Sequence, residues 1–235
     1  MKRKLFEIIL LFIIFFPFTL TITSMMTSSE QINTAELFNI PYFISYILMT
    51  VPQLLLLGYI IIVSKQPLAD FGIVRPQISK IGWVALGVVC ALAIAFWSSL
   101  IATNLPEGIR DIVSKKQIPT VLSPQALVVS FFFCVLVGYK EEFFFRSYLF
   151  TRLQEMRLPV WAAVLAASVI FGSLHFYQGI MGIFVTMGIG FIFQWLYIQT
   201  RNLHVVAAAH ALYNFSLFLL AFLLKDFLPE LSFLF

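Results

Sequence analysis

Long apolar runs separated by short polar segments dominate the chain. A hydrocarbon core about 30 Å thick is crossed by roughly 20 apolar residues in a helix, so runs of that length indicate spans. Seven such runs cover residues 5–23, 41–63, 81–102, 125–150, 159–176, 179–199 and 203–223. The apolar piece Phe227 to Phe235 is too short to cross alone, and it leaves the count between seven and eight. The pattern predicts an all-α fold, a polytopic membrane helix bundle of seven to eight transmembrane helices.

Composition and charge support a membrane protein. The 235 residues are 61% hydrophobic and 11% charged, whereas soluble domains are about half apolar and a quarter charged. The net charge of +4 does not indicate nucleic-acid binding, because the basic residues sit at the ends of the runs and form no stripe with aromatics. A cytoplasmic N-terminus places nine Lys and Arg residues inside and four outside. We expect an integral protein of the plasma membrane in that orientation.

The chain is expected to form one integral membrane domain over residues 1–235. No Ser/Gly linker, low-complexity tract or fixed-period repeat divides it. The connections after Arg152 are short, so the helices there should pack as antiparallel neighbours. The first run has no small-residue cleavage pattern at Ser24 to Ser28, and we expect it to be retained as a span.

Four ionisable residues interrupt the fourth apolar run, at Lys140, Glu141, Glu142 and Arg146. Each costs about 2.5 to 3.5 kcal/mol in a span, so together they need partners or a water-filled cavity, and function is the default hypothesis. Glu142 and Arg146 are four apart, in the favourable order for an ion pair on one helix face. Glu141 has Phe145 at that spacing and therefore needs a partner from another helix. For Lys140 two interpretations stay open, a snorkelling stem or a pair with a neighbouring acid.

Polar partners for Glu141 occur downstream in other apolar runs. His175 ends the fifth run, while His210 and Asn214 lie four apart in the seventh and so share one helix face. A Glu in an apolar pocket can act as a general base, and neutral His can share a proton, bind metal or donate to an oxyanion. The set predicts attack by water on an amide carbonyl. Hydrogen bonds that merely join helices, or a proton or ion path, are the alternatives.

Three motifs in this region resemble those of a known family. They are Glu141-Glu142-Phe-Phe-Phe-Arg146, Phe171-Gly-Ser-Leu-His175 and His210-Ala-Leu-Tyr-Asn214. In this order, on successive apolar helices, they are similar to the E-E-x-x-x-R, F-x-x-x-H and H-x-x-x-N motifs of the CAAX proteases and bacteriocin-processing enzymes. That family, also called CPBP or Abi intramembrane proteases, includes the type II CAAX prenyl endopeptidase. The resemblance covers about residues 121–222, the expected catalytic core.

The resemblance implies an intramembrane endopeptidase acting on membrane-embedded or lipidated peptides. It assigns activation of the attacking water to Glu141 and His175, and stabilisation of the oxyanion to His210 and Asn214. It assigns support of the fourth helix to Glu142 and Arg146. A metal-free glutamate mechanism is the preferred interpretation. A zinc ion held by Glu141, His175 and His210 is the alternative, because two His and one Glu form a zinc ligand set.

One prediction concerns depth in the membrane. By counting residues, His175 lies towards the outer end of its span and His210 towards the cytoplasmic end of its own. A shared site therefore requires that the fifth helix be short or tilted. A separation of the two imidazoles above about 12 Å, well beyond one water-bridged contact, would count against a shared site.

Two further function classes remain open. A non-catalytic bacteriocin immunity or scaffold protein could use the same fold. A small-molecule transporter is the third hypothesis, although its usual inverted repeat with paired broken helices is not found in the sequence. The apolar residues that would select a substrate look alike, so the substrate stays open among prenylated C-terminal motifs, peptide pheromone precursors, bacteriocin leaders and other membrane proteins.

Overall fold

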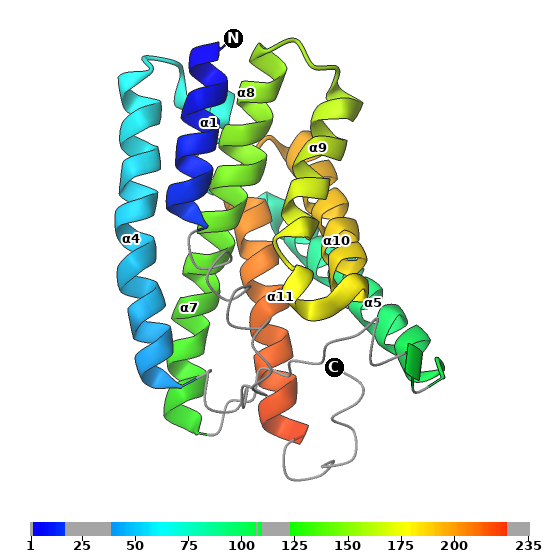
Figure 1. Cartoon of the computed structure of the whole chain (residues 1–235). Coiled ribbons are helices and arrows are strands. Elements are labelled where there is room, and N and C mark those ends of the chain that lie inside the picture. The colour runs from blue at the N-terminus through cyan, green and yellow to red at the C-terminus, as the bar shows by residue number, and fades with distance from the viewer. Residues whose placement is uncertain (1, 17–38, 107, 110–122, 225–235) are drawn as a thin grey trace.

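The computed structural model describes residues 2–16, 39–106, 108–109 and 123–224, and Figure 1 shows them as a bundle of helices. Within those ranges the regular structure is helical, with no strand, which confirms the predicted all-α class. The long elements are α1 (Lys2–Phe15), α4 (Ile40–Val63), α5 (Ile81–Thr103), α7 (Pro124–Glu142), a π-helix (Phe143–Leu149), α8 (Phe150–Glu155), α9 (Val160–Ser173), α10 (Gly179–Thr200) and α11 (Leu203–Leu224). Short 3-10 helices cover Leu68–Phe71, Ile78–Lys80 and Phe176–Gln178.

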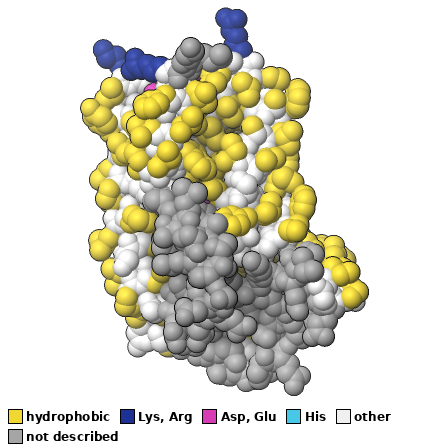
Figure 2. Space-filling model, in the orientation of Figure 1, with side chains coloured by type: hydrophobic (Ala, Val, Ile, Leu, Met, Phe, Trp, Pro, Cys, Tyr) yellow, Lys and Arg dark blue, Asp and Glu magenta, His cyan; other side chains and the backbone are white. Residues whose placement is uncertain are grey.

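Four segments of the described chain are long and apolar enough to cross a membrane: Ile40–Val63, Ile78–Thr103, Phe176–Thr200 and Leu203–Leu224. Figure 2 agrees, since hydrophobic side chains cover much of the visible bundle while Lys and Arg gather at the end where α1 begins. These segments are those of an integral membrane protein.

The predicted count of seven to eight spans is not confirmed. Both α1 and α9 have 14 residues, short of the length that crosses a bilayer. The fourth apolar run forms a continuous rod of α7, the π-helix and α8, but it carries the charged cluster. The rest of the first run and the piece Phe227 to Phe235 lie outside the described residues.

Polar caps fix where two of the helices begin. The side chain of Asn39 accepts a hydrogen bond from the backbone N–H of Tyr42 at the start of α4. Ser123 does the same for Ala126 at the start of α7, where Pro124 occupies the first helical position. Such caps satisfy amide groups that have no partner inside the helix. They set the register of α7 and hence the position of the charged cluster near the end of that helix.

Close backbone contact joins α7 to α11. A Cβ atom on Gly138 would lie 2.7 Å from the carbonyl oxygen of Ala207 and 3.0 Å from the amide nitrogen of Ala211. The same occurs between α9 and α10, where a Cβ on Gly172 would lie 2.7 Å from the carbonyl oxygen of Ile183. Small residues allow helices to approach this closely in lipid. Each contact lies about one turn before candidate site residues, so the glycines bring those residues against their neighbours.

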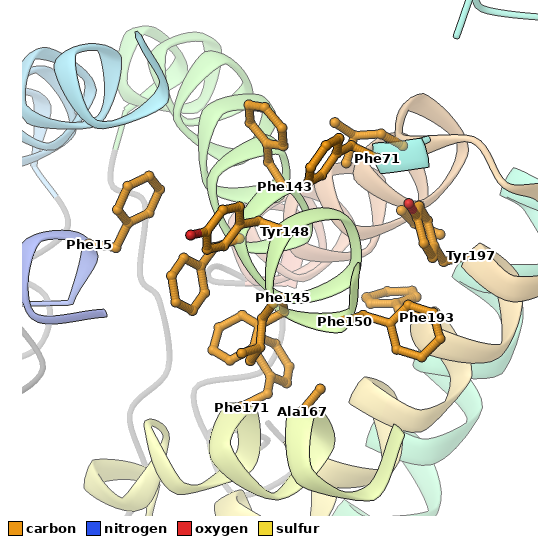
Figure 3. Packing of buried hydrophobic residues seen from close by; sticks show 14 of the residues in the cluster. Phe15, Phe71, Phe143, Phe145, Tyr148, Phe150, Ala167, Phe171, Phe193 and Tyr197 are labelled. Carbon is orange, nitrogen blue, oxygen red and sulfur yellow. The ribbon is translucent and has the colours of Figure 1, made fainter. Parts of the chain in front are cut away.

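An aromatic core surrounds the π-helix (Figure 3). All seven of its residues are buried. Phe144 packs on Phe15 of α1 with ring centroids 5.4 Å apart, and Phe145 meets Phe171 of α9 at 5.2 Å, edge to face. Aromatic pairs at such separations stabilise a core beyond the area they bury. The core therefore holds α1 and α9 on opposite sides of the rod that carries the charged cluster.

A polar cluster joins α1 to α8 at the basic end of the bundle. Lys4 Nζ lies 2.7 Å from Glu155 Oε2, and Arg152 Nη1 donates to Glu155 and to Gln66 Oε1. Burial by itself would raise the pKa of the Glu155 carboxyl, but hydrogen bonds from Gln66, Lys4 and Arg152 outweigh it and lower that pKa. The carboxylate is thus the centre of the contact between the two helices.

Candidate active site

Glu142 joins two helices through both of its carboxylate oxygens. Its side chain is fully buried, and Oε1 lies 2.7 Å from His210 Nδ1 of α11. Oε2 lies 3.1 Å from Arg146 Nε, an ion pair that does not have hydrogen-bond geometry. The predicted pair of Glu142 and Arg146 is therefore present. The interpretation that this pair accounts for Glu142 is incomplete, because Glu142 also holds His210.

Glu141 lies on the other side of the same imidazole. Its Oε2 is 3.8 Å from His210 Nε2, and its side chain is 13% exposed, so a water molecule can reach it. A carboxylate on Nδ1 requires the proton of that nitrogen, which leaves Nε2 facing Glu141. The ring of His210 thus lies between two consecutive carboxylates. This supplies the partner from another helix that the spacing argument required for Glu141.

His175 lies in the turn that follows α9. Its Nδ1 is 3.0 Å from the carbonyl oxygen of Phe171. A carbonyl only accepts, so Nδ1 carries the proton and Nε2 remains as the acceptor of the ring. His175 interacts electrostatically with Glu141 and with His210. Its backbone position at the end of a short helix keeps it near the charged cluster.

The distance between the imidazoles of His175 and His210 follows from the contacts that both rings make with Phe171. The ring of Phe171 lies 5.1 Å from that of His175 and 6.1 Å from that of His210, so the two imidazoles are at most about 11 Å apart. The separation is within the limit set from the sequence. The 14 residues of α9 also match the expectation of a short fifth helix. The short helix ends early enough for His175 to face α11.

Asn214 lies one turn along α11 from His210 and is half-buried. Within the described chain its side-chain amide forms no hydrogen bond with Glu141, His175 or His210. The structure therefore places it on the predicted face, in line with His210, but not in direct contact with the other three. A residue at this position can meet a substrate atom bound beside His210.

Arg146 holds the π-helix against two other helices. Its guanidinium is buried, with Nη2 donating to the carbonyl oxygen of Gly190 at 3.3 Å. The Cζ atom lies 4.4 Å from the ring centroid of Phe171. These contacts and the ion pair with Glu142 tie Arg146 to α9, α10 and its own helix. π-Helices are rare in proteins overall, and those that occur are often found at functional sites. No pattern in the sequence indicated this one.

The structure adds contacts that sequence reasoning did not identify. Tyr177 packs on His175 with ring centroids 5.9 Å apart and planes 30° from parallel, and it interacts electrostatically with Glu141. Phe193 packs on His210 at 5.2 Å. His204 is half-buried and shares a 2.8 Å hydrogen bond with the Tyr139 hydroxyl. Only Phe176 separates His175 from Tyr177 in the chain, and this closeness was the available signal for the first of these contacts.

Metal binding was the alternative expectation for these residues. In the described ranges, no three His, Cys, Asp or Glu side chains are grouped so that they could hold a metal ion. The alternative zinc set of Glu141, His175 and His210 is therefore not supported by the geometry.

Comparison with known proteins gives one match. Residues 123–216 match a family model described as Type II CAAX prenyl endopeptidase Rce1-like. The matched range contains all three motifs, from Glu141 to Asn214. A search of curated proteins found no match to the chain, and a search of solved structures found none either.

Proposed function

We propose that the chain, whose residues 123–216 match the model of the type II CAAX prenyl endopeptidases, is a protease of that family and hydrolyses peptide bonds within the membrane using a water activated by Glu141. The observation that carries the proposal is the position of His210 between Glu141 and the buried Glu142. This arrangement places several ionisable groups in an apolar bundle, which costs free energy of folding. Groups retained at such a cost are interpreted by default as functional.

Glu141 is the group that accepts the first proton. Its partly exposed carboxylate takes a proton from water as the water oxygen bonds to the carbonyl carbon of the substrate. His175 has Nδ1 committed to a backbone carbonyl, so Nε2 can accept a hydrogen bond from the same water and orient it. The resulting intermediate is tetrahedral and carries a negatively charged oxygen.

His210 and Asn214 stabilise that oxygen. The carboxylate of Glu142 holds the ring of His210 through Nδ1, so Nε2 is the nitrogen from which the protonated ring donates to that oxygen. The amide of Asn214, one turn away on the same face, donates a second hydrogen bond. When the intermediate collapses, the carbon–nitrogen bond breaks and the proton held by Glu141 passes to the leaving amine. One water is consumed, and Glu141 returns to its starting state.

The substrates are membrane-associated or lipidated peptides of the CAAX type. The family description refers to a prenylated Cys near a C-terminus, which is a lipid anchor. A bundle with four apolar spans gives such an anchor a lipid phase from which to reach Glu141. The proposed location is the plasma membrane with the N-terminus in the cytoplasm, and the Lys and Arg side chains gathered at the end where α1 begins support this orientation.

The proposal is tested with purified protein in liposomes and a farnesylated reporter peptide that ends in a CAAX sequence. Wild-type protein should release the C-terminal fragment, detected by mass spectrometry, and Glu141→Gln should not. Asp70→Asn is the matched control, because it removes an exposed acid in a different part of the bundle. It should cleave as wild type does.

Cleavage by Glu141→Gln at the wild-type rate contradicts the proposal. If neither protein cleaves, but a biological effect such as immunity is retained in Glu141→Gln, the non-catalytic scaffold hypothesis is favoured. Solute flux in the same liposomes would instead favour a transporter.

A further inference from the structure

The ammonium group of Lys140 is buried in an aromatic environment. The side chain is 2% exposed, and Nζ donates to the Tyr46 hydroxyl at 3.2 Å. The same nitrogen lies 4.7 Å from the ring centroid of Tyr46 and 5.4 Å from that of Phe16. In the described ranges no carboxylate forms an ion pair with it. Neither interpretation left open by the sequence, snorkelling or a close acid partner, fits this position.

A buried ammonium group of this kind normally has more hydrogen-bond acceptors and a counter-ion. An ammonium has three N–H donors, and the Tyr46 hydroxyl takes one of them. Buried charges are normally paired, and ionisable groups at membrane depth usually mark a substrate or ion site. The neighbouring cation Arg146 follows that rule, since Glu142 is its counter-ion. Among the described residues, Arg146 thus has a carboxylate in ion-pair contact, whereas Lys140 does not.

Lys140 also adjoins the water-activating group. It directly precedes Glu141, and successive side chains of a helix point about 100° apart, so the two groups open onto neighbouring faces of α7. Glu141 interacts electrostatically with Lys140 and with the Tyr46 hydroxyl that Lys140 contacts. An extended peptide advances about 3.3 to 3.6 Å per residue, so a chain lying across Glu141 needs only a few residues to reach the ammonium.

The depth of Lys140 decides which anion can reach it. The rod of α7, the π-helix and α8 runs from Pro124 to Glu155, with Lys140 near its middle. At about 1.5 Å per residue, the ammonium is on the order of 20 Å from either end of the rod. Lipid phosphates lie outside a hydrocarbon core about 30 Å thick, so they do not come to this depth. A peptide drawn into the site can bring its own carboxylate there.

We propose that Lys140, with the Tyr46 hydroxyl beside it, binds the free C-terminal carboxylate of the substrate peptide and so determines that cleavage occurs a few residues from that end. The proposal rests on the proposed function and adds a subsite to it. Lys140 is a specificity-determining residue in this account, since it contacts the substrate terminus and not the reacting atoms.

The test uses two farnesylated CAAX reporter peptides that differ only at the C-terminus, one a carboxylate and the other a carboxamide. Each is cleaved in liposomes by wild type, Lys140→Met, Lys140→Arg and the control Lys65→Met, which removes an exposed lysine after α4. The readouts are kcat, KM and the thermal midpoint of each variant. Lys140→Gln replaces Lys140→Met if the latter does not accumulate.

Wild type and Lys65→Met should prefer the carboxylate peptide by about tenfold to a hundredfold in kcat/KM, mostly through KM, as for a charge-assisted hydrogen bond. Lys140→Arg should keep most of that preference. Lys140→Met should lose this preference, because its kcat/KM should fall for the carboxylate peptide and stay unchanged for the carboxamide peptide. Its thermal midpoint should not fall, because an apolar residue of similar size replaces an unpaired buried charge.

Four results would overturn the subsite. Lys140→Met could keep the wild-type preference, or it could slow on both peptides equally with a lower thermal midpoint, which is the signature of a structural role. Wild type could also cleave both peptides equally well, which rejects the subsite and leaves the proposed function standing. Cleavage of neither peptide by wild type rejects the proposed function, and the subsite with it.

Discussion

Substituting Gly138→Ala should separate α7 from α11 and disable the site without touching any of its side chains. The added Cβ would lie 2.7 Å from the carbonyl oxygen of Ala207, about 0.7 Å closer than ordinary contact at 3.4 Å. Both near atoms at this point belong to backbone of α11, which cannot rotate out of the way. The helices must therefore move apart by a similar distance, at a cost of about 1 to 3 kcal/mol in stability.

The functional effect follows from the contacts next to that glycine. A shift of this size lengthens the 2.7 Å contact of Glu142 with His210 beyond hydrogen-bond range and widens the 3.8 Å gap to Glu141. Misplacement of about 1 Å can cost on the order of a hundredfold in rate. We expect kcat on the reporter peptide to fall by about tenfold to a hundredfold.

The matched control is Gly58→Ala in α4, where no atom lies within 4 Å of the added Cβ. Replacing Gly by Ala inside a helix with open space should raise stability by about 0.5 to 1 kcal/mol and leave kcat unchanged. The measurements are reporter cleavage and thermal midpoints in the same detergent. Wild-type stability and rate in Gly138→Ala would refute the close packing on which this reasoning depends.

Two more predictions concern other charged groups. Glu142→Leu should cost about 3 to 5 kcal/mol of stability, because it leaves the charge of Arg146 buried and unpaired. The double variant Glu142→Leu with Arg146→Met should regain stability. It should not regain cleavage, because Nδ1 of His210 still lacks its carboxylate partner. Recovery of cleavage would contradict this. The stability that the ion pair of Lys4 with Glu155 contributes should be fully present above the ordinary pKa of Glu, about 4.3. It should be lost as the pH falls through the lowered pKa of the Glu155 carboxyl. Hydrogen exchange of α1 measures this, and an unchanged acid transition in Glu155→Gln would be inconsistent with it.

Contacts within one helix were predictable from the sequence. The spacing of Glu142 and Arg146 indicated their ion pair, and the rotation of Glu141 indicated a partner on another helix. Such inferences depend on the helical repeat alone, which the apolar runs establish. The requirement for a short helix before His175 also followed from counting residues against the thickness of a bilayer.

Contacts between helices were not predictable in the same way. The hydrogen bond of Glu142 with His210 depends on how closely α7 approaches α11, which Gly138 sets and which a single sequence does not reveal. The same is true of Tyr46 beside Lys140, since these residues are far apart in the chain. No pattern in the sequence indicated the π-helix after Glu142, all of whose residues are buried.

The central claim is that Glu141 and His210 belong to one hydrolytic site. The most direct measurement is a double-mutant cycle on kcat/KM for the reporter peptide with Glu141→Gln, His210→Ala and the two combined. Residues that act as a unit lose activity non-additively, so the account predicts that the double variant is about as slow as the slower single variant. Independent losses that add in the double variant, or cleavage that persists in it, would contradict the claim.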